Sequence, residues 1–422
     1  MNASGTVLLL SLLGATPAPS DPLCEKREPC RLVETLEAGK DAQGRPMQVK
    51  RLWLGWADPD TAAESLGKKF PAGGRKREGS RAEGECEAAE WWLVRPGQPA
   101  QLLLSVCNDG YGAAGVGEDS VIVSENLFTH EQTGGSRERW STSRTLQLSP
   151  PRLMSEGHRS ASIHQPEKES GDFWSHEALR GEVVRAAPEC EPGEASLGER
   201  TLPYLPRVRV EKSYLQGGWK EAGLGECGLE AGHFLLGTQD DPAEAGLKAL
   251  LVAPDTLLAE VRDDKWTGPS GKWLTDDHLE LWLAPLPPQE LTGCGKPTAE
   301  QKPVQWGIRM VDGKVFPAYG APKRPLKVER VELAGGKGYR LKVTLPTPFQ
   351  GIGVVYSDSD RGKKQELMLA TSPVKFARPE TLNPVRVVPP EEATCQVKGG
   401  ALKPVQGPPR KAEPDVALLG VE

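Results

Sequence analysis

Short apolar segments separated by Gly-, Asp- and Ser-rich turns recur through this chain of 422 residues, and they constrain its fold more than any other feature. Residues 101–107 (QLLLSVC), 120–124 (SVIVS) and 144–148 (RTLQL) are typical of β-strands in length, composition and boundaries. Helical periodicity is confined to two short stretches, residues 60–69 and 175–181. With 47 Gly and 38 Pro, the chain is also poorly suited to long helices. The sequence therefore predicts a mostly β protein.

Alternation between apolar and polar residues is clearest in the C-terminal half. In residues 278–283 the three leucines fall on one face, whereas His278, Glu280 and Trp282 fall on the other. Residues 304–310 alternate in the same way, and further strand pairs joined by Gly-containing turns follow them. Six or more antiparallel strands at this spacing predict a jelly-roll-like antiparallel β-sandwich, preceded by a β-rich N-terminal domain.

The N-terminus predicts export. Residues 7–13 (VLLLSLL) form an apolar run, and small residues follow at Ala15, Ala18 and Ser20, so residues 1–20 are typical of a signal peptide. The run is too short to span a bilayer, and no later stretch predicts a membrane span. An apolar N-terminal strand is the alternative interpretation. We expect a periplasmic or extracellular protein.

Cysteine usage agrees with export, because the number is even, no CxxC occurs and the wide scatter suits disulfide bonds better than a zinc site. The eight residues are Cys24, Cys30, Cys86, Cys107, Cys190, Cys227, Cys294 and Cys395. Nearness along the chain predicts that Cys24 pairs with Cys30, and that Cys86, Cys107 and Cys190 pair mostly within the N-terminal half. The odd number of cysteines in each half permits one bridge between domains.

Composition divides the chain. Residues 191–206 mix Pro, Gly and charge without periodicity, which predicts a linker between a β-rich domain of unknown function at residues 21–190 and the sandwich at residues 207–390. The Pro-rich residues 391–422 are expected to run extended over the surface, tethered if Cys395 is bridged. The formal charge of -6 argues against a nucleic-acid binder that works through a basic surface.

Three segments of the C-terminal half carry a family resemblance. They are residues 250–264 (LLVAPDTLLAEVRDD), 273–285 (WLTDDHLELWLAP) and 351–372 (GIGVVYSDSDRGKKQELMLATS). In this order they resemble the family-nine carbohydrate-binding module and its relatives, over residues 208–390. The resemblance implies a β-sandwich that binds a saccharide or related ligand, often carries structural calcium and is not itself catalytic. One departure is residues 285–303, which contain Cys294, interrupt the usual strand succession and are expected to cover or reshape the binding face.

Tryptophans beside charged residues are the candidate glycan contacts. Sugars present CH faces that stack on flat rings and hydroxyls that need polar partners. Trp266 and Trp273 lie in an acidic loop, and Trp282 shares its strand face with Glu280 and, from the neighbouring strand, Arg309. These five residues are the predicted carbohydrate site. Alternatively, the rings close the edge of the sandwich.

Paired acids predict calcium. Calcium needs six to eight oxygen ligands, which clustered carboxylates in loops supply. Asp358 and Asp360 are the best candidates, with Asp276 and Asp277 next, and further doublets occur at residues 240–241 and 263–264. Turn-forming Asp residues explain any single doublet equally well.

Catalytic signals are poor. The GxGxxG matches at residues 110–115 and 223–228 do not open helices, which argues against a dinucleotide, and no organic cofactor is expected. The sequence therefore predicts an exported, non-catalytic glycan-binding protein. One alternative is a structural or protein-interaction module with a partner in the cell envelope, favoured if the polar face of the His278 strand is covered by the N-terminal half or by residues 285–303. The other is an enzyme with a catalytic N-terminal half and a C-terminal targeting module.

Overall fold

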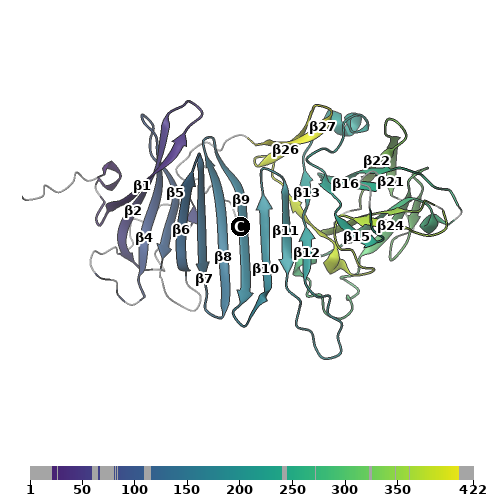
Figure 1. Ribbon diagram of the computed structural model, residues 1–422, viewed down its shortest axis with the longest axis horizontal. Coiled ribbons are helices and arrows are strands. Elements are labelled where there is room, and N and C mark those ends of the chain that lie inside the picture. The colour runs from purple at the N-terminus through teal and green to yellow at the C-terminus, as the bar shows by residue number, and fades with distance from the viewer. Residues whose placement is uncertain are drawn as a thin grey trace, which may run out of the picture. The chain divides into compact units, whose positions relative to one another are not determined.

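In a computed structural model, β-strands make up most of the regular secondary structure of the described residues (Figure 1). It describes residues 21–25, 27–58, 65–66, 80, 82, 84–108, 116–239, 245–270, 272–322, 326–346, 348–360 and 362–407. The predicted signal peptide, the GxGxxG match at residues 110–115 and the acidic doublet at residues 240–241 lie outside these ranges. So does most of the helix predicted over residues 60–69, of which residues 65–66 are described as strand. The described residues divide into two compact units, one within residues 21–108 and the other within residues 116–407.

The first unit contains a five-stranded antiparallel sheet in the order β1-β2-β4-β5-β3. Its strands, which follow the short 3-10 helix η1 (Pro22–Cys24), are β1 (Arg31–Lys40), β2 (Pro46–Ala57), β3 (Ser65–Leu66), β4 (Cys86–Val94) and β5 (Gln101–Asn108). Disulfides join Cys24 to Cys30, as the sequence predicted, and Cys86 to Cys107. Both bridges reach a small apolar cluster beside Leu52.

The second unit begins with an antiparallel meander of seven strands, each paired with its neighbours in sequence. The strands are β6 (Val116–Ser124), β7 (Leu127–Gly134), β8 (Glu138–Leu148), β9 (Pro151–Ser162), β10 (Gln165–Ser175), β11 (Arg180–Arg185) and β12 (Arg200–Pro203). None of the β9 side chains is buried, so the middle of this sheet remains open to solvent. The helix predicted over residues 175–181 is wrong: Ser175 ends β10 and Arg180 begins β11. Strand pairing overrides a helical pattern of only seven residues.

A two-layered β-sandwich follows the meander. One sheet contains β13 (Leu205–Val208), β14 (Leu229–Glu230), β16 (Ala245–Val252), β17 (Thr256–Asp263), β21 (Lys327–Glu332) and β22 (Gly338–Thr344). The other contains β15 (His233–Leu236), β18 (His278–Ala284), β19 (Val304–Arg309), β20 (Val315–Pro317), β23 (Gly351–Asp358), β24 (Leu367–Ala370) and β25 (Asn383–Val387). The two sheets join where β25 pairs with β13. The fold class predicted from the sequence is confirmed.

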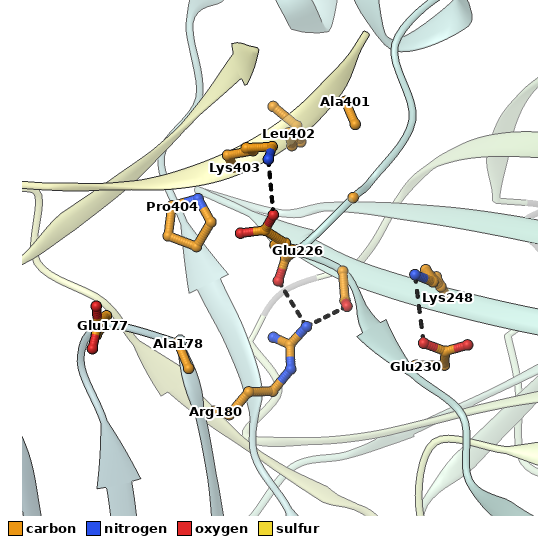
Figure 2. Close-up of a pocket in the computed structure, with 12 residues that line it drawn as sticks. Glu177, Ala178, Arg180, Glu226, Glu230, Lys248, Ala401, Leu402, Lys403 and Pro404 are labelled. Atoms are coloured by element: carbon orange, nitrogen blue, oxygen red, sulfur yellow. Dashed lines mark hydrogen bonds and ion pairs between the residues drawn. The ribbon is translucent and has the colours of Figure 1, made fainter. Parts of the chain in front are cut away.

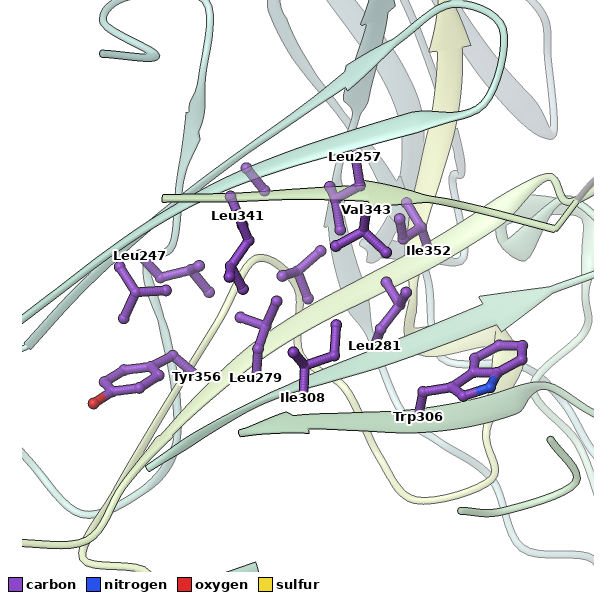
Figure 3. Packing of buried hydrophobic residues seen from close by; sticks show 14 of the residues in the cluster. Leu247, Leu257, Leu279, Leu281, Trp306, Ile308, Leu341, Val343, Ile352 and Tyr356 are labelled. Carbon is purple, nitrogen blue, oxygen red and sulfur yellow. The ribbon is translucent and has the colours of Figure 1, made fainter. Parts of the chain in front are cut away.

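The sandwich core lies between these sheets (Figure 3). Leu257 and Val343 of one sheet face Leu279, Leu281 and Ile308 of the other. Because side chains alternate across a strand, the inward leucines of β18 leave its other residues on the outer face of the sheet, as the sequence predicted. That outer face is where the predicted carbohydrate site must lie.

Short elements cover the sandwich. They are α1 (Lys212–Gln216), the 3-10 helices η3 (Gly218–Lys220), η4 (Trp273–Thr275), η5 (Pro288–Glu290) and η6 (Pro379–Thr381), and a hairpin of β26 (Ala393–Lys398) and β27 (Ala401–Gln406). Among the residues described, no helix has the length and apolar character needed to cross a membrane.

Two long-range disulfides connect distant segments of the second unit. Cys190 bonds to Cys294, which is the one bridge between the two halves that the odd cysteine counts permitted, and Cys227 bonds to Cys395 on β26. Nearness along the chain could not identify Cys294 as the partner of Cys190, because strand order in space brings residues 190 and 294 together. The segment 191–206, predicted as a linker, contains β12 and the beginning of β13.

Candidate functional site

The outer face of β18 and β19 carries a row of polar and aromatic side chains. Antiparallel pairing sets His278 opposite Arg309, Glu280 opposite Gly307, and Trp282 opposite Gln305. Residues opposite each other in an antiparallel pair share a face. Three of the five predicted carbohydrate contacts, Glu280, Trp282 and Arg309, therefore lie on one surface, as the sequence suggested.

Trp282 is buried on this face. Its side chain is 2% exposed and packs in a small apolar cluster with Val374 and Leu382. The edges or faces of Tyr319 and Phe376 also contact the ring, with centroids 6.2 and 5.6 Å away. A ring covered in this way has no free face for stacking, which corrects the expectation that Trp282 contacts a sugar directly. The alternation of β18 predicted the face of the sheet on which Trp282 lies. It could not predict the burial of Trp282, because the residues that cover the ring come from loops distant in sequence.

Glu280 lies at the centre of the row, 6% exposed. It accepts hydrogen bonds from Gln305 Nε2 at 2.7 Å and from Trp282 Nε1 at 3.2 Å, and His278 Nε2 lies 3.4 Å from its other oxygen. Burial alone would raise the pKa of Glu280, but its contacts with His278, Trp282 and Gln305 outweigh burial and keep that pKa below its usual range. The site therefore holds an ionised acceptor.

Arg309 lies at one end of the row and is 7% exposed. Its Nη1 donates to Asp276 at 3.1 Å, while Nε and Nη2 form a bidentate pair with Asp312 at 3.0 and 2.5 Å. Three charge-assisted bonds fix the guanidinium in one orientation. Little of the predicted contact surface of Arg309 or Glu280 is accessible, because both side chains are committed to partners within the protein.

Trp273 is a half-buried ring beside Glu280. It stacks on Phe316 with centroids 5.7 Å apart and meets His278 edge-on at 4.8 Å. The ring lies directly over Gly307, where a Cβ atom would come within 2.2 Å of it. Glycine at this strand position therefore admits the aromatic ring.

Phe376 flanks the opposite end of the row and is the site residue that the sequence analysis missed. Its side chain is 70% exposed, and its ring meets Tyr319 at 5.1 Å and Trp282 at 5.6 Å. The next residue, Ala377, has a φ of 56°, an uncommon conformation for a residue with a Cβ that tends to occur at functional loops. The sequence signal was faint, because Phe376 stands in a loop without alternation.

The loop that carries Phe376 is fixed to the segment around Cys294. Arg378 donates to the carbonyl oxygens of Gly295 at 2.7 Å and Gly293 at 3.1 Å, and its Nε donates to Glu380. Residues 285–303 thus support the loop beside the face. The side chains identified as covering the row come from the sandwich itself, namely Trp273, Phe316, Tyr319 and Phe376.

A second group of predicted residues forms a carboxylate cluster. Asp263, Asp358 and Asp360 each bring one oxygen within 4.8 Å of the others. Asp277 lies beside them and accepts a hydrogen bond from the Ser359 amide at 2.9 Å. Burial, reinforced by the charges of Asp358 and Asp277, raises the pKa of Asp263 to about 8 although the Tyr356 hydroxyl donates to it. Without a cation, the cluster retains a proton near neutral pH.

Two predicted residues lie apart from the groups assigned to them. Asp276 belongs to the Arg309 network and accepts a bond from the Ser270 amide at 2.7 Å, so it does not join the carboxylate cluster. Trp266 packs edge-on against Tyr339 at 4.5 Å and donates to the Gly336 carbonyl, which places it beside the sandwich core and not on the outer face of β18. The sequence neighbours of Asp276 and Trp266 do not predict these locations.

A hollow of about 700 Å³ lies between the β10–β11 turn, the Cys227 loop and the β26–β27 hairpin (Figure 2). Arg180 donates to the carbonyl oxygens of Glu226 and Gly228, and Lys403 pairs with Glu226 at 3.0 Å. These contacts therefore connect the β10–β11 turn and the β26–β27 hairpin to the Cys227 loop.

Comparisons with known proteins give matches among solved structures alone. No protein-family model matches the sequence, and no curated protein matches it. A family-nine carbohydrate-binding module from Caldicellulosiruptor kristjanssonii in complex with cellotriose is similar at 11% identity and a TM-score of 0.30, over 44% of this chain and 92% of that one. A module from the same organism in complex with glucose is similar at 11% identity and a TM-score of 0.29, over 44% and 94%. These structures are of the family that residues 208–390 resemble in sequence.

Proposed function

We propose that this protein is exported and binds a saccharide on the outer face of β18 and β19, between Trp273 and Phe376, without catalysing a reaction. The observation that carries the proposal is the Phe376 ring, 70% exposed and held by two aromatic neighbours at the end of a row whose centre is an ionised carboxylate. An exposed ring held in place by other rings offers a flat apolar surface on which a sugar ring can stack. The four disulfides are typical of an oxidising compartment and support export to the periplasm or cell exterior.

The proposed chemistry assigns different tasks to these groups. The CH face of a pyranose stacks on Phe376, and Trp273 bounds the other side of the site. Sugar hydroxyls meet Glu280 and Gln305 where these side chains, 6% and 7% exposed, reach the surface. Trp282 supports Phe376 from beneath and donates to Glu280, while the bidentate pair with Asp312 holds Arg309 in position.

We further propose that the carboxylate cluster holds a structural calcium ion. Asp263, Asp358 and Asp360 offer hard oxygen ligands, which calcium prefers, and Asp277 adds negative charge next to them. The cluster connects Asp263 at the end of β17 to Asp358 at the end of β23, one strand from each sheet. A cation there neutralises repulsion between carboxylates and stabilises that edge of the sandwich.

The test measures binding of the full chain to a panel of soluble polysaccharides and oligosaccharides that includes cello-oligosaccharides. Phe376→Ala should weaken binding about tenfold, because stacking supplies the apolar contact. Phe234→Ala is the matched control: this ring is 48% exposed but lies on β15, away from the row. Equal binding by wild type and Phe376→Ala would contradict the proposed site.

The proposed calcium site has a separate test. Removal of calcium with a chelator should lower the unfolding temperature.

A structural or protein-interaction module of the cell envelope is the second candidate. The observation that favours it is the burial of Trp282, Glu280 and Arg309, whose polar atoms are largely satisfied within the protein. In that case Phe376 contacts a partner protein. A folded chain that binds no saccharide in the panel, and that retains its unfolding temperature with each of them, would support this candidate.

A further inference from the structure

Phe173 is an exposed ring on the open face of the meander. It lies near the end of β10, opposite Gly157 of β9 and Glu182 of β11, so these three residues share one face of the sheet. The side chain is 47% exposed. The meander was assigned no role by the sequence, and no contact of this ring belongs to the sandwich site.

The ring lies beside Gly157 on the neighbouring strand. A Cβ atom on Gly157 would lie 3.4 Å from a ring carbon of Phe173 and 3.3 Å from the Ser143 hydroxyl. Glycine is unfavourable inside a strand and often marks a place where another group approaches the backbone closely. Here the ring lies at contact distance from the Gly157 position, and the side chain is 47% exposed to solvent.

A hollow of about 390 Å³ adjoins this ring. Its walls carry the carboxylates of Glu169, Glu182 and Glu199, against a single guanidinium, that of Arg159. Arg159 lies 3.4 Å from Glu169, and both side chains are well exposed, so this pair is weak and leaves the hollow with excess negative charge. A flat apolar ring beside several carboxylates complements a ligand that is both cyclic and cationic.

We propose that this face of the meander is a second binding site, for a saccharide that bears free amino groups. The sugar ring stacks on Phe173, and a protonated amine of the same or the next sugar lies among Glu182 and Glu199. The neighbouring strand supplies hydroxyl groups on the same face, because Ser143 pairs with Gly157 and Ser141 pairs with Arg159. The site is separate in residues and in charge from the one between Trp273 and Phe376.

The experiment uses the full chain carrying Phe376→Ala, so that the sandwich site does not dominate the signal. A tetramer of glucosamine, its N-acetylated counterpart and cellotetraose are compared by calorimetry at low salt and at 0.5 M salt. The glucosamine tetramer should bind most tightly, and its affinity should fall at high salt because exposed charges are screened. N-acetylation removes the positive charge and keeps the ring, so it isolates the contribution of the carboxylates.

Two variants assign the binding to this face. Phe173→Ala and Glu182→Gln should each weaken binding of the glucosamine tetramer about threefold to fivefold, the effect expected for exposed cation–aromatic and charge contacts. Ile122→Ala is the matched control, because Ile122 is 56% exposed on β6 of the same sheet. If Phe173→Ala perturbs the fold, Glu182→Gln, which keeps the side-chain shape, decides. Unchanged binding in Glu182→Gln, or equal binding of the N-acetylated tetramer, would overturn the proposal, whether or not the sandwich binds a saccharide.

Discussion

Trp282 and Phe376 touch each other, yet their replacement should have opposite consequences. Trp282 is 2% exposed in an apolar cluster, so Trp282→Ala leaves a cavity and should lower the free energy of unfolding by about 3–5 kcal/mol. Phe376 is 70% exposed, and Phe376→Ala should lower that free energy by less than about 1 kcal/mol. Urea denaturation of the two variants measures both changes. A Trp282→Ala variant that keeps its stability but loses saccharide binding would show that this ring contacts the ligand.

This pair of residues also shows which features of the site can be predicted from the sequence. Alternation within β18 places Trp282 and Glu280 on the outer face, because side chains in a strand alternate strictly. The alternation does not show what covers that face. Tyr319 and Phe376 stand about 40 and about 90 residues after Trp282, and only the order of the strands in space brings them to it. Exposure of Phe376 likewise depends on the loop conformation around Ala377. The local pattern therefore predicts on which face of a strand a side chain lies. Whether that side chain is exposed depends on the tertiary structure.

His176 links three elements through charge. Its ring, 3% exposed, follows β10, with Nδ1 2.8 Å from Glu392 before β26 and Nε2 3.4 Å from Glu156 on β9. Arg386 of β25 also contacts Glu156 at 2.7 Å. Burial lowers the pKa of His176, but the two carboxylates outweigh it and raise that pKa above its usual value. The contact with His176, opposed by burial and reinforced by Arg386, lowers the pKa of Glu156 to about 2.

The sign of each shift predicts the pH dependence of stability. His176 gains a proton more readily in the folded state, so its contribution is complete below its unfolded pKa and is lost as pH rises through the raised folded value. Glu156 contributes above its unfolded pKa, and its contribution is lost as pH falls toward 2. Between pH 6 and pH 9 the urea midpoint of the wild type should therefore fall more than that of His176→Gln. Parallel curves for the two proteins would show that this contact is too weak to matter.

The β26–β27 hairpin depends on a single covalent link to the Cys227 loop. Cys395 pairs with Cys227 across 168 residues, and both side chains are fully buried. Replacement of both by serine should lower the free energy of unfolding by about 3–5 kcal/mol, because the bridge closes a long loop. Hydrogen exchange of β26 and β27 should increase. The matched control replaces Cys24 and Cys30, whose bridge spans 6 residues in the other compact unit and should leave exchange in this hairpin unchanged.

At the scale of the whole molecule, the sandwich shares a core with segments outside residues 208–390. A second apolar cluster on its outer side joins Trp174 and Val183 of the meander to Trp219 and Leu258 of the sandwich, and includes Leu402 of the hairpin. Burial of large apolar side chains supplies most of the stability of such a cluster. The boundaries at residues 190 and 390 were predicted from composition alone. The Pro and Gly content of a segment does not show whether the residues on its two sides share a core.

A fragment of residues 208–390 should therefore be less stable than one of residues 110–411. The shorter fragment exposes Leu258 and Trp219 and loses the partner of Cys227, so it should bind an apolar dye and unfold at a lower temperature without a sharp transition. The longer fragment keeps the whole cluster and should unfold in one cooperative step. Thermal unfolding followed by near-UV circular dichroism compares them. If residues 208–390 unfold cooperatively at the same temperature as residues 110–411, the meander adds nothing to the sandwich core and the boundaries predicted from composition are the physical ones.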